Sequence, residues 1–315
     1  MIAGAEPQTH ARARIRVSHE TRYRYTSPVS LSRQLLHLTP RTLAHQTVTA
    51  HRIAITPAPA ETGSRVDYFD NPTVHAVITT PHRELSVLAE SIVDLAPRRL
   101  PGALTAAPPC DWHVVRDSLA APRDGADFAA ARFTFESPHV ALSPDLSAYA
   151  RPSFAGDRSL VESLMSLMKR IHADFEFDQA ATSVATPLAD VLKQRSGVCQ
   201  DFAHLMTGCL RAMGLAARYV SGYILTNPPP GQARLIGSDA SHAWVSVWCP
   251  GADPGCGDWV DLDPTNDCLP DQEHVTLAWG RDFSDVTPTR GVFLGSGDED
   301  LSVHVTVSRL ADPAA

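Results

Sequence analysis

Lysine is almost absent from this 315-residue chain, which contains only Lys169 and Lys193. A protein that crosslinks to itself through its own amines needs lysines, so this shortage argues against self-crosslinking. The chain also lacks an apolar run of the roughly 18 residues that a membrane span requires. Residues 1–16 lack the basic start and apolar segment of a secretory signal. From these absences we expect a cytoplasmic protein without a membrane span.

Positive charge is not in excess either. The formal net charge is -8 at pH 7, which argues against nucleic acid or an anionic membrane as a partner and leaves basic partners open. The cysteines are irregularly spaced in a long chain, so we expect reduced thiols and not a disulfide framework. They are Cys110, Cys199, Cys209, Cys249, Cys256 and Cys268.

The first part of the chain, residues 1–100, is predicted to form a β-rich domain. Apolar residues alternate with polar ones from Ile15 onward, and 47–55 is rich in β-branched residues. Short runs of this kind between turn signals are typical of a β-sandwich. Residues 101–155 are rich in proline and alanine, which predicts a connector with one short helix near 112–119.

Helical patterns dominate after residue 156. Four apolar residues share one face of a helix predicted over 159–171, which indicates core packing. They are Leu160, Leu164, Met168 and Ile171. Thr186 is expected to cap the next helix, with proline at its first position and Gly197 as its end. A further helix is predicted to begin at or just after Cys199 and to end at Gly214.

A cysteine at a helix N-terminus has altered chemistry. Unpaired N–H groups and the positive end of the helix dipole stabilise a thiolate. The Cys199 amide is also placed to donate to the oxyanion that forms when an acyl carbon becomes tetrahedral. Gln194 is a candidate second donor, although a solvent-facing helix residue is the stronger interpretation. A small buried apolar residue is the weaker interpretation of Cys199, because a base and an acid follow it.

A histidine and two acids follow on two predicted strands, which a loop at 249–256 separates. His242 shares one strand face with Trp244, and Asp261 and Asp263 share a face of the next strand. If the strands form a hairpin, one register sets His242 opposite Asp263, and a slip of two residues sets it opposite Asp261. Since either carboxylate can then reach the imidazole, spacing alone leaves two candidate acids.

A cysteine, a histidine and an acid are together the groups that a thiol nucleophile needs. Nearby polar residues have simpler interpretations. His204 is expected to cap or pack, and Asp201 to complement the helix dipole, with substrate binding as an alternative. A zinc site formed by the last three cysteines and His274 is disfavoured, because structural zinc ligands pair at spacings of about two to four residues. We therefore expect no metal.

Four short motifs stand in order in the second half of the chain. They are Gly-Val-Cys199-Gln-Asp-Phe-Ala-His, Arg218-Tyr-Val-Ser-Gly-Tyr223, Ser-His242-Ala-Trp and Asp263-Pro-Thr-Asn266. This order resembles the bacterial transglutaminase-like family of the papain-type superfamily. In that family's pattern the acid is the one that heads Asp-Pro-Thr, which implies Asp263 and not Asp261.

Two further regions resemble the same family. Tyr23-Arg-Tyr-Thr-Ser-Pro followed by Leu38-Thr-Pro-Arg is similar to its β-rich N-terminal domain, and 280–291 with 301–307 is similar to its C-terminal tail. The resemblance implies an α+β fold, with a papain-like core of helices packed on an antiparallel sheet and an N-terminal β-sandwich domain. The implied divisions are an N-terminal domain, a connector, a catalytic core and a tail that packs on either domain. They cover residues 1–100, 101–155, 156–275 and 276–315.

The resemblance also implies a function, namely thiol-dependent acyl transfer on carboxamide or peptide bonds. Cys199, His242 and Asp263 would form the catalytic triad, with a thioester intermediate. We expect hydrolysis, as by a cysteine protease or amidase, because nothing in the chain marks a lysine-acceptor site. Protein-glutamine amine transfer and a non-catalytic peptide-binding module are the alternatives. The expected partners are a peptide or protein acyl donor and a water or amine acceptor, and no cofactor is expected.

Overall fold

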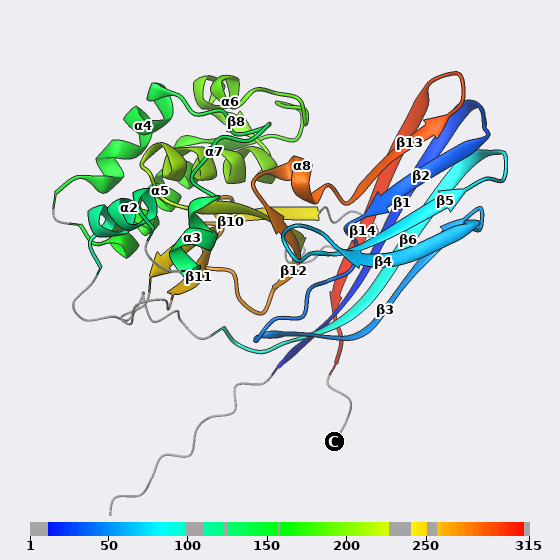
Figure 1. Cartoon of the computed structure of the whole chain (residues 1–315), viewed down its shortest axis with the longest axis horizontal. Coiled ribbons are helices and arrows are strands. Elements are labelled where there is room, and N and C mark those ends of the chain that lie inside the picture. The colour runs from blue at the N-terminus through cyan, green and yellow to red at the C-terminus, as the bar shows by residue number, and fades with distance from the viewer. Residues whose placement is uncertain are drawn as a thin grey trace, which may run out of the picture.

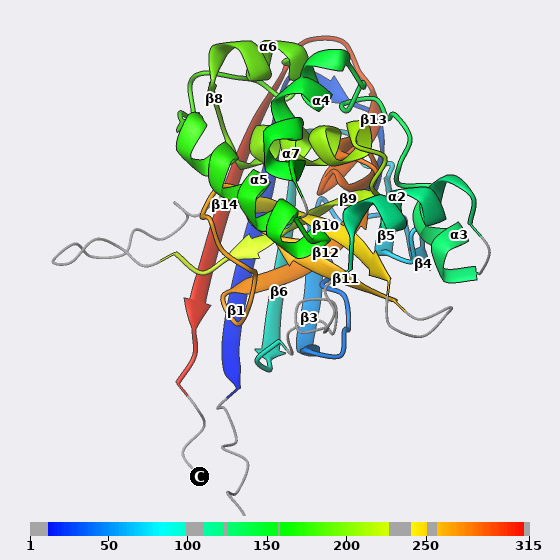
Figure 2. The same ribbon diagram turned by 90° about the vertical axis from the view of Figure 1, so that its left-hand side faces the viewer.

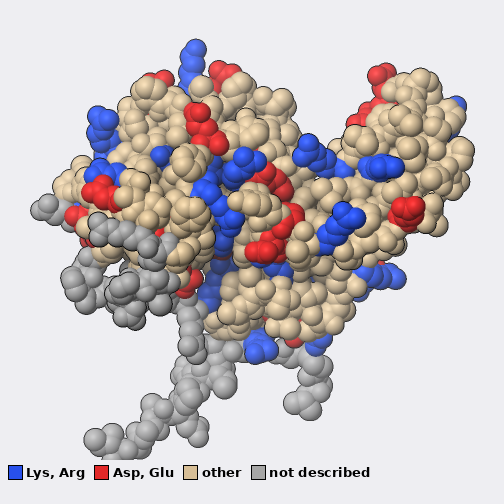
Figure 3. All heavy atoms as spheres, viewed as in Figure 1, with Lys and Arg blue, Asp and Glu red and all other residues tan. Residues whose placement is uncertain are grey.

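The computed structural model describes residues 12–98, 110–122, 125–156, 158–226, 241–250 and 257–311. Figure 1 shows two parts, an elongated pair of β-sheets and a mixed core of helices and strands. Figure 3 shows the same view as a surface, with a notch between the two parts at the top and contact below it. Across the described residues, no helix is long and apolar enough to cross a membrane.

The elongated part is a β-sandwich, as the sequence predicts. Six strands come from the N-terminal region: β1 (Ala13–Val29), β2 (Leu31–Leu36), β3 (Gln46–Thr56), β4 (Glu61–Val66), β5 (Pro72–Ile78) and β6 (His82–Leu95). Two come from the C-terminal region, β13 (Thr289–Leu294) and β14 (Glu299–Arg309). The sheet orders are β14-β1-β6-β3 and β13-β2-β5-β4. Buried and more exposed side chains alternate along β6, so one face of its sheet fills the interior.

The two C-terminal strands belong to the sandwich and not to the core. β14 pairs antiparallel with β1 from Ile15↔Arg309 to Tyr25↔Glu299, and β13 pairs with β2. Figure 1 shows this as red and orange strands beside blue ones. The start and the end of the chain therefore build one domain, in which each C-terminal strand covers an edge of a sheet.

The region expected as a connector contains several helices. The predicted helix is present as α2 (Trp112–Ala120), and α3 (Gly125–Ala131), α4 (Pro144–Ala150) and a 3₁₀ turn, η1 (Arg151–Phe154), follow it. Asp111 caps α2, and Ser143 caps α4 with proline at its first position. Buried side chains of these helices join the main hydrophobic core. This region is therefore part of the core, and not only a link between domains.

The core has helices on one face of a four-stranded antiparallel sheet. The strands are β9 (Ala217–Ile224), β10 (Ser241–Pro250), β11 (Gly257–Leu262) and β12 (His274–Gly280), in the order β11-β10-β9-β12. The helices are α5 (Leu160–Asp174), α6 (Leu188–Gln194), α7 (Cys199–Ala212) and α8 (Phe283–Val286), and β7 (Glu176–Phe177) pairs with β8 (Ser196–Gly197). α7 packs on β9 and β10, and Figure 2 shows the helices in front of this sheet.

The helix predictions of the core are confirmed for α5 and α7 and need a correction for α6. α5 carries a capping box of Ser159 and Glu162 and buries the predicted apolar stripe. α6 begins one residue later than predicted, with Pro187 at the N-cap, because the Thr186 hydroxyl accepts a bond from the Ser183 N–H instead. Its end is set by Arg195, which has a left-handed φ of 59°, and not by Gly197.

Two side-chain amides of the sandwich bind the outer edge of β12. Gln46 donates to the Thr276 carbonyl at 2.8 Å and accepts from its N–H at 2.8 Å. Asn71 likewise donates to the Trp279 carbonyl at 2.8 Å and accepts from the Trp279 N–H at 3.0 Å. These amides satisfy backbone groups that an edge strand would leave unpaired. β12 also spans the expected division at 275/276, so the core sheet continues to Gly280.

Candidate active site

Cys199 is the first residue of α7, as predicted. The N–H of Val198 donates to Asp201 Oδ2 at 2.8 Å, and the Thr182 hydroxyl donates to the same oxygen at 2.6 Å. A Cβ atom on Gly197 would lie 2.6 Å from that oxygen, so the carboxylate folds back over the helix start because residue 197 is glycine. Asp201 thus fixes the helix start and, with it, the half-buried Cys199.

His242 places an imidazole next to this thiol. It lies near the start of β10, which pairs with β9 through His242↔Gly222. The Cys199 sulfur lies 3.9 Å from the backbone carbonyl oxygen of Ser241, the residue before His242, and Cys199 is one of the groups that raise the pKa of His242. Because Nε2 of His242 is bonded to Asp263 at 2.7 Å, Nδ1 is the nitrogen left for the sulfur.

The strand register that brings Asp263 to His242 differs from both predicted registers. β10 and β11 pair through Ser246↔Asp261, which is displaced by two residues from the first predicted register, in the direction opposite to the alternative. Continuing this register sets position 263 opposite Trp244, diagonal to His242. Diagonal neighbours on one sheet face stay within reach of long side chains. Asp263 therefore contacts His242 although the predicted pairing was wrong.

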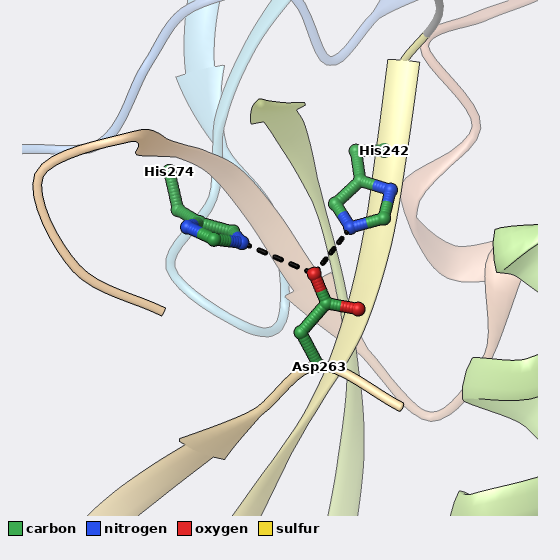
Figure 4. Close-up of side chains that lie close together, drawn as sticks. All are labelled: His242, Asp263 and His274. Carbon is green, nitrogen blue, oxygen red and sulfur yellow. Dashed lines mark hydrogen bonds and ion pairs between the residues drawn. The ribbon is translucent and has the colours of Figure 1, made fainter. Parts of the chain in front are cut away.

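The carboxylate of Asp263 is held by several donors at once. Oδ2 receives His242 Nε2 at 2.7 Å, His274 Nε2 at 3.1 Å and Asn266 Nδ2 at 2.7 Å. Oδ1 accepts the backbone N–H groups of Thr265 at 3.0 Å and Asn266 at 3.2 Å. Figure 4 shows both imidazoles directed at the same carboxylate oxygen. The acid is thus fixed in position as well as buried.

These contacts set the charge states of the pair. Burial acts to raise the pKa of Asp263, but hydrogen bonds from His242 and His274, the charge of His242 and the bond from Asn266 hold this pKa well below its usual range. Burial acts to lower the pKa of His242, yet the hydrogen bond with Asp263, the interaction with Cys199 and the charges of both residues raise this pKa to about 10. At neutral pH a carboxylate therefore faces an imidazolium.

Asp261, the alternative acid, has other partners. Arg98 Nη1 forms an ion pair with its Oδ2, and Trp244 Nε1 donates to the same oxygen at 3.1 Å. Burial acts to raise the pKa of Asp261, but the charge of Arg98 and the hydrogen bond from Arg98 keep this pKa below its usual value. This carboxylate is occupied by a guanidinium and an indole, and so it does not orient His242.

His274 is a site residue that the sequence did not predict in this place. Its Nε2 contacts Asp263, its Nδ1 is buried without a partner among the described residues, and its ring stands edge-on to Trp244 at 5.4 Å. It begins β12, which pairs with β9 and lies at the opposite edge of the sheet from β11. No local pattern reveals such a contact. Asn266, by contrast, is part of the Asp-Pro-Thr-Asn motif, which was a usable signal.

The cluster of His242, Asp263 and His274 also has the composition of a metal site, with ligand atoms within 4.8 Å of one another. A metal ion would need a free Nε2 lone pair from both imidazoles. The raised pKa of His242 instead keeps that nitrogen protonated at neutral pH, and both Nε2 atoms are hydrogen-bonded to the carboxylate. The donor set therefore suits hydrogen bonding better than a resident metal.

Most of the other residues that the sequence singled out have partners of their own, and one lies outside the described residues. His204 Nε2 is buried and accepts from the Phe283 N–H at 3.1 Å, which confirms a packing role. The side-chain amide of Gln194 donates to the Ser196 carbonyl at 3.1 Å, so its contact is with the turn that follows α6. Of the disfavoured zinc ligands, Cys249 is buried, Cys268 is half-buried, and Cys256 lies outside the described residues.

Comparisons with known proteins identify relatives of both parts of the chain. Residues 15–94 match the family model of the bacterial transglutaminase-like N-terminal region, and 147–264 match that of the transglutaminase-like superfamily. An uncharacterized protein of Mycobacterium tuberculosis is 43% identical over 296 residues, or 93% of this chain and 92% of that protein. A protein-glutamine gamma-glutamyltransferase of Pseudomonas aeruginosa is 30% identical over 125 residues, or 39% of this chain and 18% of that protein.

A solved structure shares the whole fold. The crystal structure of a candidate cysteine protease from Cytophaga hutchinsonii matches with a TM-score of 0.72 at 20% identity, over 97% of this chain and 93% of that chain. At this identity the match speaks for the fold alone. It confirms the predicted α+β architecture, in which a β-sandwich accompanies a papain-like core.

Proposed function

Because this chain belongs to the transglutaminase-like superfamily, we propose that it is a cysteine enzyme that transfers acyl groups from carboxamide or peptide bonds. One observation carries the proposal. Cys199, at the start of α7, interacts closely enough with His242 to raise its pKa, and Nε2 of His242 is bonded to Asp263. A sulfur, a base and an orienting acid in this order are the parts of an activated thiol nucleophile.

In the proposed reaction the thiol proton of Cys199 already resides on the His242 imidazolium before the substrate binds, and the Cys199 thiolate attacks the acyl carbon. The carboxylate of Asp263, which stays ionised because its pKa is held low, stabilises the imidazolium. The oxygen of the tetrahedral intermediate accepts a hydrogen bond from the Cys199 N–H at the helix start. His242 then protonates the leaving amine as the C–N bond breaks, which leaves a thioester on the sulfur.

Water is the proposed acceptor that resolves the thioester. Its proton goes to His242, its oxygen bonds to the acyl carbon, and the C–S bond then breaks to release the carboxylic acid and the Cys199 thiolate. We favour hydrolysis because nothing in the chain marks a site for an acceptor lysine. Amine transfer is the second candidate, since a segment of the Pseudomonas aeruginosa gamma-glutamyltransferase is similar to this chain. In both cases the acyl donor is a peptide or protein.

A glutamine-containing peptide incubated with and without a primary amine separates the candidates. Release of ammonia alone supports an amidase, an amine adduct supports a transferase, and backbone fragments support a protease. The Cys199→Ala variant should form none of these products. Turnover that persists in this variant would overturn the nucleophile, and peptide binding without turnover by the native chain would leave a non-catalytic module.

A further inference from the structure

A cavity of about 790 Å³ lies where the core meets the sandwich, and neither Cys199 nor His242 lines it. Its walls include Arg218, Trp259, Thr276 and Trp279 from the core sheet, with His45 and Arg98 from the sandwich side. Small-molecule sites typically have volumes of about 300–1,000 Å³ and are common at domain interfaces. The size and the place of this cavity therefore suit a ligand.

Arg218 is the central cation of this cavity. Its neighbour Tyr219 packs on His204 of α7, so strand alternation turns Arg218 to the other face of the sheet. The guanidinium carbon lies 4.1 Å from the ring centroid of Trp259 and 3.8 Å from that of Trp279. The two indoles hold the guanidinium by cation–π contacts. Stacking of this kind leaves the N–H edge of the group available to an anion.

Part of that N–H edge, the Nε group, has no partner among the described residues. Arg218 is only 9% exposed, and its Nε is buried without a hydrogen-bond partner. Burial lowers the pKa of Arg218 to about 9, and Asp261 and Asp258 oppose this through their charges. Asp261 is itself ion-paired with Arg98. A buried cation without a bonded counter-charge is unfavourable, and an anion in the cavity would remove this cost.

Other unpaired polar atoms point to the same space. Nε and Nη2 of Arg98, Oγ1 of Thr276 and Nε2 of His45 are all buried without partners among the described residues, and these residues line the cavity. Burial, followed by the charge of Arg98, lowers the pKa of His45 to about 4, so its imidazole is neutral at pH 7. Buried polar groups are normally bonded to protein, water or a ligand. Such a group of available donors suits a carboxylate.

We propose that this cavity binds a small organic carboxylic acid, with the carboxylate at the edge of Arg218 and the apolar part against Trp259 and Trp279. One carboxylate fits at the edge of Arg218, because Asp261 is ion-paired with Arg98, and Asp258, the other acid of the lining, acts on Arg218 through its charge alone. Arginine binds a carboxylate through two parallel N–H bonds. Because the wall combines apolar surface with a cation, it suits an aromatic or aliphatic acid better than a strongly hydrated inorganic ion.

Calorimetric titration of the full chain tests the proposal with three acids and their amides. Benzoate, hexanoate and indole-3-acetate should bind at least about tenfold more tightly than benzamide, hexanamide and indole-3-acetamide, which keep the apolar part without the charge. Equal binding of acids and amides would overturn the role of Arg218. Absence of binding by all three acids would show that the cavity holds water only.

Four variants locate the binding. Arg218→Met should remove the preference for acids. Ala96→Phe fills the cavity from a lining position and should abolish binding, whereas Ala60→Phe, at an exposed site of the sandwich, should not. Cys199→Ala should bind as the native chain does, because the sulfur lies outside the cavity. If Arg218→Met does not fold, comparison of Ala96→Phe with Ala60→Phe still shows whether the acids bind in this cavity. Acid binding that survives Ala96→Phe would overturn the proposal.

Discussion

Replacement of Asp263 by asparagine removes a charge and also reverses one hydrogen-bonding group. If the amide nitrogen takes the place of Oδ2, it faces His242 Nε2, which donates at 2.7 Å, and His274 Nε2 at 3.1 Å. If it takes the place of Oδ1, it faces the backbone N–H groups of Thr265 and Asn266. In either orientation a donor faces donors, so the variant cannot hold the imidazole as the carboxylate does.

The size of the effect follows from the pKa of His242. Its rise from 6.5 to about 10 corresponds to roughly 5 kcal/mol of extra stability for the imidazolium. Cys199 supplies part of this, so we assign roughly half to Asp263. Loss of about 2.5 kcal/mol lowers a rate by roughly 10²-fold, and a misoriented imidazole adds to this. We therefore expect turnover to fall by about 10²–10⁴-fold in Asp263→Asn.

Two assays measure this loss. One is release of product from a glutamine peptide, and the other is the rate of Cys199 alkylation by iodoacetamide as a function of pH, which needs no substrate. Asp261→Asn is the matched control, since it changes the same chemical group two residues away. That variant should keep most of its reactivity and lose stability, because it leaves Arg98 without its carboxylate. Greater loss of activity in Asp261→Asn than in Asp263→Asn, with both variants folded by circular dichroism, would refute the assignment.

The same substitution should change how stability depends on pH. Because the folded-state pKa of His242 is raised, its pairing stabilises the fold fully below pH 6.5, and this contribution is lost as the pH rises through about 10. Asp263 contributes in the acidic range instead. Because its folded-state pKa is lowered, its ionised form stabilises the fold at pH values above the usual pKa of an aspartate, and this contribution is lost as the pH falls below that value. In Asp263→Asn, the decline in the free energy of unfolding between pH 6.5 and 10 should become smaller. An unchanged decline, measured by denaturant titration, would contradict the pairing.

Three further outcomes are expected. Cys199 should be the cysteine that iodoacetamide labels fastest at neutral pH, and peptide mapping that finds another cysteine labelled first would contradict its role. Gly197→Ala should lower the free energy of unfolding by about 1–3 kcal/mol, because its Cβ would lie 2.6 Å from Asp201 Oδ2; an unchanged denaturation midpoint would argue against this. His274→Gln should lower turnover by about tenfold, since Asp263 loses one of several donors; a loss equal to that of Asp263→Asn would show a direct role.

Local patterns in the sequence were sufficient for the position of Cys199 and for the strand that carries His242, but not for the strand register. The composition suggested a loop over 249–256, whereas β10 continues to Pro250 and β11 begins at Gly257. Because β10 extends two residues beyond the predicted start of the loop and β11 begins where the loop was predicted to end, the pairing register shifts by two residues. An even shift leaves each side chain on its original sheet face. This is why Asp263 still meets His242.

Pairing between distant segments could not be predicted, because a strand pattern states its period and not its partner. β14 pairs with β1, and β12 carries His274 to Asp263 from the far edge of the sheet. The α4 helix is a different case. Ser143 followed by proline is a recognisable helix start, and the high proline content of the surrounding region obscured it.

The sandwich contributes to the site through β12. Gln46 binds both backbone groups of Thr276, and Thr276 lies two residues after His274 on the same strand. The position of the His274 imidazole, and hence one of the donors to Asp263, therefore depends on a contact made by the N-terminal domain. Because the outer edge of β12 has no neighbouring strand in the described sheet, this side-chain amide takes the place of one. The N-terminal sandwich and the core sheet thus form a single structural unit around the carboxylate, and not two independent modules.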